Sequence, residues 1–209
     1  MAEPRTLSVY IDFKSPYAYL AKDLVYELGR ELPVKLDWLP YDLDLAAALG
    51  SARLDAEGRV VEENRNPHQW RRVRYSYMDC RRQAQKRGLT IRGTRKIWDS
   101  SIALRGMLYA KQQGAGVLRR YNDITFERFW KRELDIENPA VVAGVLAEAG
   151  AGVAGVPAYL EGPGRAELAA ICRDAEEKGV FGVPSFILEG ELYWGREHLP
   201  DIRAVLAGQ

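Results

Sequence analysis

A serine followed by a proline lies where an alternating apolar stretch runs into a helical pattern, in the segment DFKSPYAYLA (residues 12–21). Serine is a favoured helix N-cap and proline a favoured first helical residue, so the pair predicts that a helix begins here. A helix N-terminus also favours anions, thiolates included. Ser15 is too weak an acid to replace a thiolate, and no His-Asp pair follows it to activate it as a nucleophile. Two roles therefore stay open: a helix cap, or a hydroxyl that donates to a thiolate supplied by a ligand.

A second candidate feature is the dipeptide Val183-Pro184, at the start of an apolar run near the C-terminus. A trans proline is tolerated at the start of a strand. A cis peptide bond would instead present the Val183 N–H and C=O to an extended, peptide-like ligand. These residues alone leave both conformations open.

The two cysteines, Cys80 and Cys172, are far apart, and neither belongs to a CxxC motif. We expect both to be small core residues rather than a redox pair or a zinc site. His68 lies in a polar Asn-Pro-His-Gln run and is expected to be solvated, so no metal site is predicted.

Composition indicates a soluble globular protein with a sizeable core: the chain has 209 residues, of which 47% are hydrophobic and 28% charged. No signal peptide or membrane-spanning run is readable, so a cytoplasmic protein is expected. The net charge is +1, but residues 65–98 contain eleven Lys or Arg and a single acid, Asp79. Such a stretch could bind nucleic acid, an anionic small molecule, or nothing.

The elements that position these residues follow from hydrophobic periodicity. Alternation over 6–13 and again after Pro33, around a helical stripe over 16–30, predicts a right-handed βαβ unit. Two short apolar runs, 183–188 and 191–194, flank Glu189-Gly190 and predict a hairpin, and a last helix covers 199–206. Between them the pattern is helical, over 70–84, 100–113, 117–133, 138–149 and 164–178, with a Gly-rich loop near 150–165.

The expected fold class is therefore α/β: a thioredoxin-like fold of order βαβ…ββα, split by a large all-helical insertion. Residues 1–41 and 179–209 would form the discontinuous thioredoxin-like domain, and residues 42–178 the insertion domain.

Two long motifs carry a resemblance to a known family. DFKSPYAYLA together with GVFGVPSFILEGELYWGREHL (residues 179–199) resembles the 2-hydroxychromene-2-carboxylate isomerase family, relatives of the kappa-class glutathione transferases. Arg74-Tyr75 and the run Asp79-x-x-Arg82-x-Ala84 are similar to a helix of that family. The resemblance covers nearly the whole chain. It implies that Pro184 is cis and that Ser15 is a site residue.

The resemblance implies glutathione as the cofactor. By position, Ser15 would meet the glutathione sulfur, and Val183 beside Pro184 would make the backbone contacts to its cysteinyl part. Trp194 and the turn after it would flank the γ-glutamyl end. The other residues carried over to the cofactor are Asn66 (or else Asn64), Arg72 in place of a family lysine, and Glu197 and His198 in place of a family Asp-Arg pair; Tyr17 and Arg74 are expected to contact the substrate.

The activity implied is that of a glutathione-dependent isomerase, which interconverts a 2-hydroxychromene-2-carboxylate-type ring acid and its ring-opened hydroxybenzylidenepyruvate form. A thiolate adds to the conjugated carbon, the ring opens, a former double bond rotates, and the thiolate leaves. The expected partners are a small aromatic carboxylate and a second copy of the chain in a homodimer, with no nucleic acid and no membrane. The alternatives are a kappa-type transferase acting on another electrophile, a thiol-disulfide oxidoreductase relative without redox activity, and a binding module that uses the basic surface.

Overall fold

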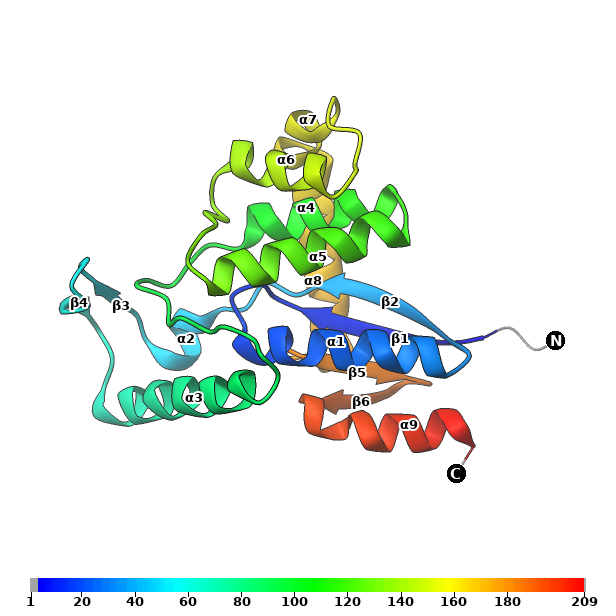
Figure 1. Ribbon diagram of the computed structural model, residues 1–209, viewed down its shortest axis with the longest axis horizontal. Helices are drawn as coiled ribbons and strands as arrows, with labels where there is room; N and C mark the ends of the chain where they lie inside the picture. The colour runs from blue at the N-terminus through cyan, green and yellow to red at the C-terminus, as the bar shows by residue number, and fades with distance from the viewer. Residues whose placement is uncertain (1–3, 209) are drawn as a thin grey trace.

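The fold is built on a four-stranded sheet in a computed structural model that describes residues 4–208 (Figure 1). The strands are β1 (Arg5–Ile11), β2 (Val34–Pro40), β5 (Ser185–Leu188) and β6 (Glu191–Trp194), in the order β2-β1-β5-β6. β1 is parallel to β2 and antiparallel to β5, and β5 is antiparallel to β6. This arrangement confirms the predicted βαβ unit and the C-terminal hairpin.

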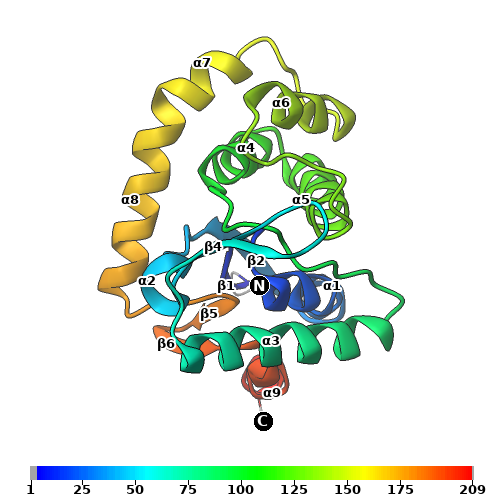
Figure 2. The ribbon, with the colours of Figure 1, turned by 90° about the vertical axis from the view of Figure 1, so that its left-hand side faces the viewer.

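Helices cover both faces of the sheet. α1 (Pro16–Glu31) lies on one face and α8 (Pro163–Glu177) on the other, and α9 (Leu199–Ala207) runs beside the β6 edge (Figures 1 and 2). Gly29 lets α1 approach β2 closely, since a Cβ on this residue would lie 2.6 Å from Leu36 Cδ1. The close contact fixes α1, and with it the position of Ser15 at the N-terminus of the helix.

Most of the chain between β2 and β5 is helical, as predicted. The helices of this insertion are α2 (Leu45–Leu49), α3 (Pro67–Gln85), α4 (Ser101–Gln112), α5 (Ala115–Trp130), α6 (Pro139–Glu148) and α7 (Val156–Glu161), followed by α8. The insertion shares its core with the sheet, because Phe13 packs edge-on against Tyr121 and Phe126 of α5, with ring centroids 5.8 and 4.9 Å apart. The insertion therefore packs against the loop after β1, where Ser15 lies.

Three parts of the insertion differ from the sequence prediction, the first being α2, which lies outside every predicted helical stretch. The segment before α3 is an antiparallel hairpin, β3 (Ala52–Leu54) and β4 (Val60–Glu63), so the insertion is not all-helical. All four β4 residues are exposed, which removes the alternation that reveals a strand in sequence. The Gly-rich segment holds α7, whose Val156 and Leu160 are buried against neighbouring helices.

The C-terminal hairpin turns at Glu189 and Gly190, whose φ angles of 54° and 86° suit a tight turn between two strands. A short 3-10 segment, Arg196–His198, then leads into α9. Among the residues that the structure describes, no helix combines the length and apolar character needed to cross a membrane.

Candidate active site

Ser15 caps α1 and points at the start of β5. Its Oγ accepts a hydrogen bond from Ala18 N and donates one to Val183 O, each 3.2 Å long. The side chain is buried, so this hydroxyl commits its single proton to the Val183 carbonyl. The predicted capping role is confirmed, and the role toward a thiolate stays a prediction.

The peptide bond between Val183 and Pro184 is cis, as the resemblance implies. The two residues immediately precede β5, and Pro184 O accepts a hydrogen bond from Gly195 N at 2.9 Å. Trp194 covers the neighbouring Gly182: a Cβ on this glycine would lie 2.8 Å from the indole Nε1. The half-exposed Trp194 ring in turn packs on Phe181, with centroids 4.9 Å apart. The backbone at residues 182–183 therefore lies between Ser15 and an indole ring.

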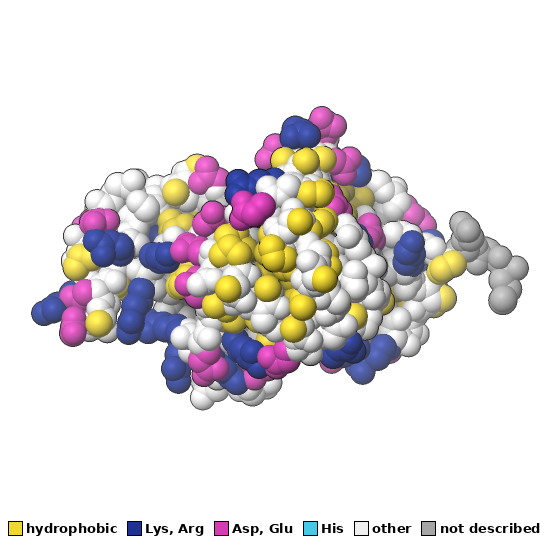
Figure 3. Space-filling model, turned by 90° about the horizontal axis from the view of Figure 1, so that it is seen from above, with side chains coloured by type: hydrophobic (Ala, Val, Ile, Leu, Met, Phe, Trp, Pro, Cys, Tyr) yellow, Lys and Arg dark blue, Asp and Glu magenta, His cyan; other side chains and the backbone are white. Residues whose placement is uncertain are grey.

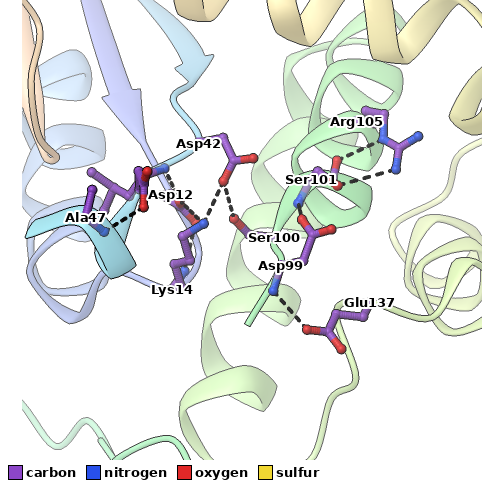
Figure 4. Close-up of polar contacts among 11 residues, drawn as sticks. Asp12, Lys14, Asp42, Ala47, Asp99, Ser100, Ser101, Arg105 and Glu137 are labelled. Atoms are coloured by element: carbon purple, nitrogen blue, oxygen red, sulfur yellow. Dashed lines mark hydrogen bonds and ion pairs between the residues drawn. The ribbon is translucent and has the colours of Figure 1, made fainter. Parts of the chain in front are cut away.

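A buried charge cluster fixes the loop that carries Ser15 (Figure 4). Asp12 is fully buried and accepts hydrogen bonds from Lys14 N (3.0 Å) and Leu43 N (2.9 Å). Lys14 Nζ lies 3.3 Å from Asp12 Oδ2 and 2.6 Å from Asp42 Oδ1, which also accepts from Ser100 Oγ. Burial favours the neutral amine, but the two carboxylates outweigh it and raise the pKa of Lys14. The loops after β1 and β2 are thus joined by a charged lysine.

Ser15, Val183 and Trp194 open into a cavity of about 520 Å³ between the sheet and the insertion. Its lining combines apolar or aromatic side chains with cationic ones, and the two kinds are interleaved: Arg65 lies 5.0 Å from the Trp70 ring centroid and Lys96 lies 4.4 Å from that of Trp98. The apolar lining comes from the loop after β2, α2, β3, α3 and the chain before α4, and includes Leu43, Leu45, Leu49, Leu54, Trp70, Val73, Ile97 and Trp98. The cationic lining consists of Lys14, Arg65, Arg74, Arg81, Arg95, Lys96 and Arg132.

Half of the predicted site residues line this cavity: Ser15, Tyr17, Arg74, Val183 and Trp194. Burial raises the pKa of the Tyr17 hydroxyl, which therefore stays protonated and lies 3.4 Å from Asp79 Oδ2. Arg74 is exposed and lies over the Trp70 ring, 5.7 Å from its centroid. Both are placed to meet a ligand, and their contact with substrate stays a prediction.

The other predicted residues lie outside the cavity lining. Pro184 is buried behind Val183, and Arg72 is an exposed residue of α3. Asn66 is the N-cap of α3 in a capping box: its side chain accepts from Gln69 N, and the Gln69 side chain accepts from Asn66 N, both at 2.9 Å. This local role accounts for the asparagine without any ligand.

Glu197 and His198 also lie away from the cavity. His198 Nδ1 is 3.1 Å from Asp201 Oδ2, so the imidazole faces the first turn of its own helix. Glu197 folds back over Gly195 and borders a smaller depression of about 340 Å³ between α1 and α9. Their contact with a glutamyl group stays a prediction that this geometry does not favour.

Neither cysteine lines the cavity. Cys80 is buried in α3, where burial raises the pKa of its thiol to about 12, and Cys172 in α8 is partly buried with a raised pKa. A thiol held protonated is a poor nucleophile. The described part of the chain therefore offers no reactive thiol at the helix N-terminus.

The sequence interpretation missed Lys14, Arg81, Arg95, Lys96 and Arg132 as individual cavity residues. Lys14 stands inside the quoted DFKSPYAYLA motif, and Arg81, Arg95 and Lys96 belong to the basic run over 65–98. The run signalled a cationic surface, but only the fold turns some of its members toward the cavity. Arg132 follows α5, and nothing in its sequence surroundings indicates a site.

Comparisons with known proteins place this geometry in a family. A family model described as the DsbA-like thioredoxin domain matches residues 6–207, and the chain belongs to this family. A curated 2-hydroxychromene-2-carboxylate isomerase from Sphingobium xenophagum is 23% identical over 205 residues, which covers 97% of this chain and 98% of that protein. The resemblance derived from the motifs is thereby confirmed.

Solved structures agree on the fold. A 2-hydroxychromene-2-carboxylate isomerase structure superposes with a TM-score of 0.74 at 20% identity, covering 97% of this chain and 95% of the other. A cytosolic disulfide reductase, DsbM, from Pseudomonas aeruginosa, solved with GSH, gives a TM-score of 0.64 at 20% identity, covering 98% of both chains. The thioredoxin-like α/β fold is confirmed by both.

Proposed function

We propose that this protein is a glutathione-dependent isomerase acting on a small aromatic carboxylate of the 2-hydroxychromene-2-carboxylate type. The observation that carries the proposal is the position of Ser15: a hydroxyl at the N-terminus of α1, beside the Val183 backbone, opening into a cavity lined by both apolar and cationic side chains. The isomerase from Sphingobium xenophagum supports the reaction, and the reductase solved with GSH supports the cofactor.

The residues around Ser15 fit a peptide-like thiol. The Val183 backbone lies beside the serine at the start of β5, and the Trp194 ring adds an apolar cover. The N-terminus of α1 favours a negative charge at this point. Neither α1 nor the segment around Val183 contains a cysteine, so glutathione would supply the nucleophilic thiolate at this point.

Ser15 would act by exchanging one hydrogen bond for another. Its only proton is donated to Val183 O, so donation to a ligand thiolate leaves this carbonyl without a partner. A ligand N–H running beside residue 183 would replace the serine on the carbonyl, as when a strand is added to a sheet edge. Ser15 would then be free to donate to the sulfur while Oγ still caps Ala18 N.

The apolar and aromatic side chains of the cavity would receive the ring of the substrate. Trp70, Trp98 and Leu54 provide the kind of lining that binds planar aromatic groups, and a volume of about 520 Å³ is ordinary for a small-molecule site. Lys14 would remain a structural cation, because its charge is already matched by Asp12 and Asp42.

The test is calorimetric titration with glutathione, followed by assays on hydroxychromene-type acids. Ser15→Gly is the informative variant, since it removes the hydroxyl and glycine costs a helix cap only a few tenths of a kcal/mol, less than alanine does. We expect Ser15→Gly to bind glutathione but to lose most of the isomerase turnover, and Ser15→Thr, which keeps a hydroxyl, to retain part of it. Wild-type protein that fails to bind glutathione would refute the proposal.

A further inference from the structure

Most of the cationic side chains that line the cavity are not paired with a carboxylate. Of its seven basic residues, Lys14 pairs with Asp12 and Asp42, and Lys96 pairs with Glu137. The other five are arginines, none of which forms an ion pair within the described part of the chain: Arg65, Arg74, Arg81, Arg95 and Arg132. Figure 3 shows Lys and Arg side chains gathered toward the end of the molecule where the β3–β4 hairpin lies.

Two of these arginines, Arg81 and Arg132, lie at the Gly93 backbone, and Arg95 follows two residues along the chain. Arg132 donates from Nε to Gly93 O at 2.7 Å, with Nη2 on the same oxygen. Arg81 Nη2 lies 3.1 Å from the place that a Cβ on Gly93 would take. Arg95, two residues along, is tied to the hairpin through Ala56 O at 3.1 Å. We call Arg81, Arg95 and Arg132 the arginine triad.

The triad gathers charge that the protein itself does not neutralise. Burial and the positive charges of Arg95, Arg92 and Arg81 lower the pKa of Arg132. A guanidinium nevertheless stays charged at any physiological pH, so the repulsion persists until an anion binds. Each guanidinium has five N–H donors, and the contacts to Gly93, Ala56 and Ile91 occupy only a few of them.

The geometry of the guanidinium groups and the residues around the triad indicate which kind of anion would bind there. Guanidinium forks match carboxylates in a bidentate way, and the triad shares its cavity with Trp98 and Leu54. We propose that Arg81, Arg95 and Arg132 form a subsite for the carboxylate of an aromatic substrate, whose ring lies against the apolar and aromatic side chains of the same cavity. The identity of that substrate rests on the proposed function.

The elements that carry these residues favour the substrate carboxylate, rather than a carboxylate of glutathione, as the ligand of the triad. Ser15 and Val183 belong to the β1–α1 and β5 parts of the sheet domain. The triad comes wholly from the insertion: α3, the chain after it, and the residue that follows the C-cap of α5. A reacting ring would therefore lie between a sulfur at Ser15 and its own carboxylate at the triad.

The experiment uses trans-cinnamate as the probe and the neutral trans-cinnamamide as its matched ligand, titrated into the full chain by calorimetry without glutathione. Arg81→Met and Arg95→Met each remove one member of the triad. Arg82→Met is the matched control, because this exposed neighbour on α3 carries the same charge but pairs with Asp79 and does not line the cavity. A parallel titration with glutathione separates the two sources of carboxylate.

We expect the wild type to bind cinnamate more tightly than cinnamamide. Each triad variant should weaken cinnamate binding about tenfold, which is the lower end of the effect of losing a hydrogen bond to a charged group, because the triad side chains are exposed. Arg82→Met should leave the cinnamate affinity within about twofold, and no variant should alter the glutathione affinity. The inference is overturned if wild type binds no cinnamate, if Arg82→Met weakens it as much as the triad variants, or if the triad variants weaken glutathione instead. Cinnamate binding at the triad without any glutathione binding would leave the subsite standing while removing the proposed function.

Discussion

Replacing Lys14 by methionine tests how the loop carrying Ser15 is held in place. The variant keeps a side chain of similar length but leaves the fully buried Asp12 carboxylate with only two backbone N–H donors. Removing one partner of a buried ion pair typically costs about 3–5 kcal/mol of unfolding free energy. For a domain whose total stability is about 5–15 kcal/mol, this is a large fraction.

Urea unfolding followed by tryptophan fluorescence measures the loss, and Lys178→Met is the matched control. Lys178 forms an exposed i,i+4 pair with Asp174 at 2.7 Å, so its removal should cost at most about 1 kcal/mol. A loss in Lys14→Met no larger than that of the control would refute the assignment of a buried, charge-matched cluster.

The pH dependence of the unfolding free energy gives an independent test of the charge on Lys14. The pKa of Lys14 is raised above 10.5, so its stabilising contribution is fully present at neutral pH and is lost only as pH rises through the raised value. Burial already raises the pKa of Asp12 in the wild type, although Lys14 and two backbone N–H groups act against it. Without the Lys14 ammonium, the Asp12 carboxylate in Lys14→Met should bind a proton still more readily in the folded state. The stability gap between wild type and variant should therefore narrow as pH falls from 7 toward 5, and a gap that widens would contradict this account.

Three further predictions concern residues of the two family motifs and of α3. Because the N-terminus of α1 carries Ser15 and Ala18 and therefore no pair of thiols, the protein should not accelerate the reduction of insulin by dithiothreitol, and catalysis that survives replacement of both cysteines would contradict this. Asn66→Ala should lower the unfolding free energy by about 1 kcal/mol through loss of the capping box, while Asn66→Asp should restore it; a weaker glutathione affinity in both variants would instead reveal a ligand contact. His198→Arg should leave the glutathione dissociation constant unchanged, because His198 faces Asp201 outside the cavity, and tighter binding by calorimetry would show otherwise.

The sheet, the caps and the cis peptide bond could be predicted because each rests on local sequence or on a long motif. Ser15-Pro16 carries its own capping chemistry, and the hairpin at Glu189-Gly190 carries its own turn. The β3–β4 hairpin had no such signal, since its second strand is exposed on both sides. Its position over the cavity depends on tertiary contacts, among them Leu54 N to Arg95 O at 2.7 Å.

The cavity lining was also predictable only in part, because some of its residues are brought there by tertiary contacts. Ser15, Val183 and Trp194 lie in motifs that a single sequence displays, whereas Arg132 reaches the cavity because α5 ends beside Gly93. Asn66 and His198 are the opposite case, because they were predicted as site residues and lie outside the cavity lining. Their positions matched a family pattern, but local partners, Gln69 and Asp201, account for both side chains. Spacing along the chain therefore predicts local helix caps more reliably than it predicts contacts between distant segments.

The pKa of the glutathione thiol bound to the protein tests the central claim about Ser15 most directly. A hydrogen bond to a charged group is worth about 1.5–3 kcal/mol, and one pKa unit corresponds to about 1.36 kcal/mol, so loss of the hydroxyl should raise the thiol pKa by about one to two units. The ultraviolet absorbance of the thiolate, titrated against pH in wild type, Ser15→Gly and Ser15→Thr, reads this pKa. We expect a raised thiol pKa in Ser15→Gly and a thiol pKa near that of wild type in Ser15→Thr. Coincident curves for all three proteins would show that Ser15 is only a helix cap.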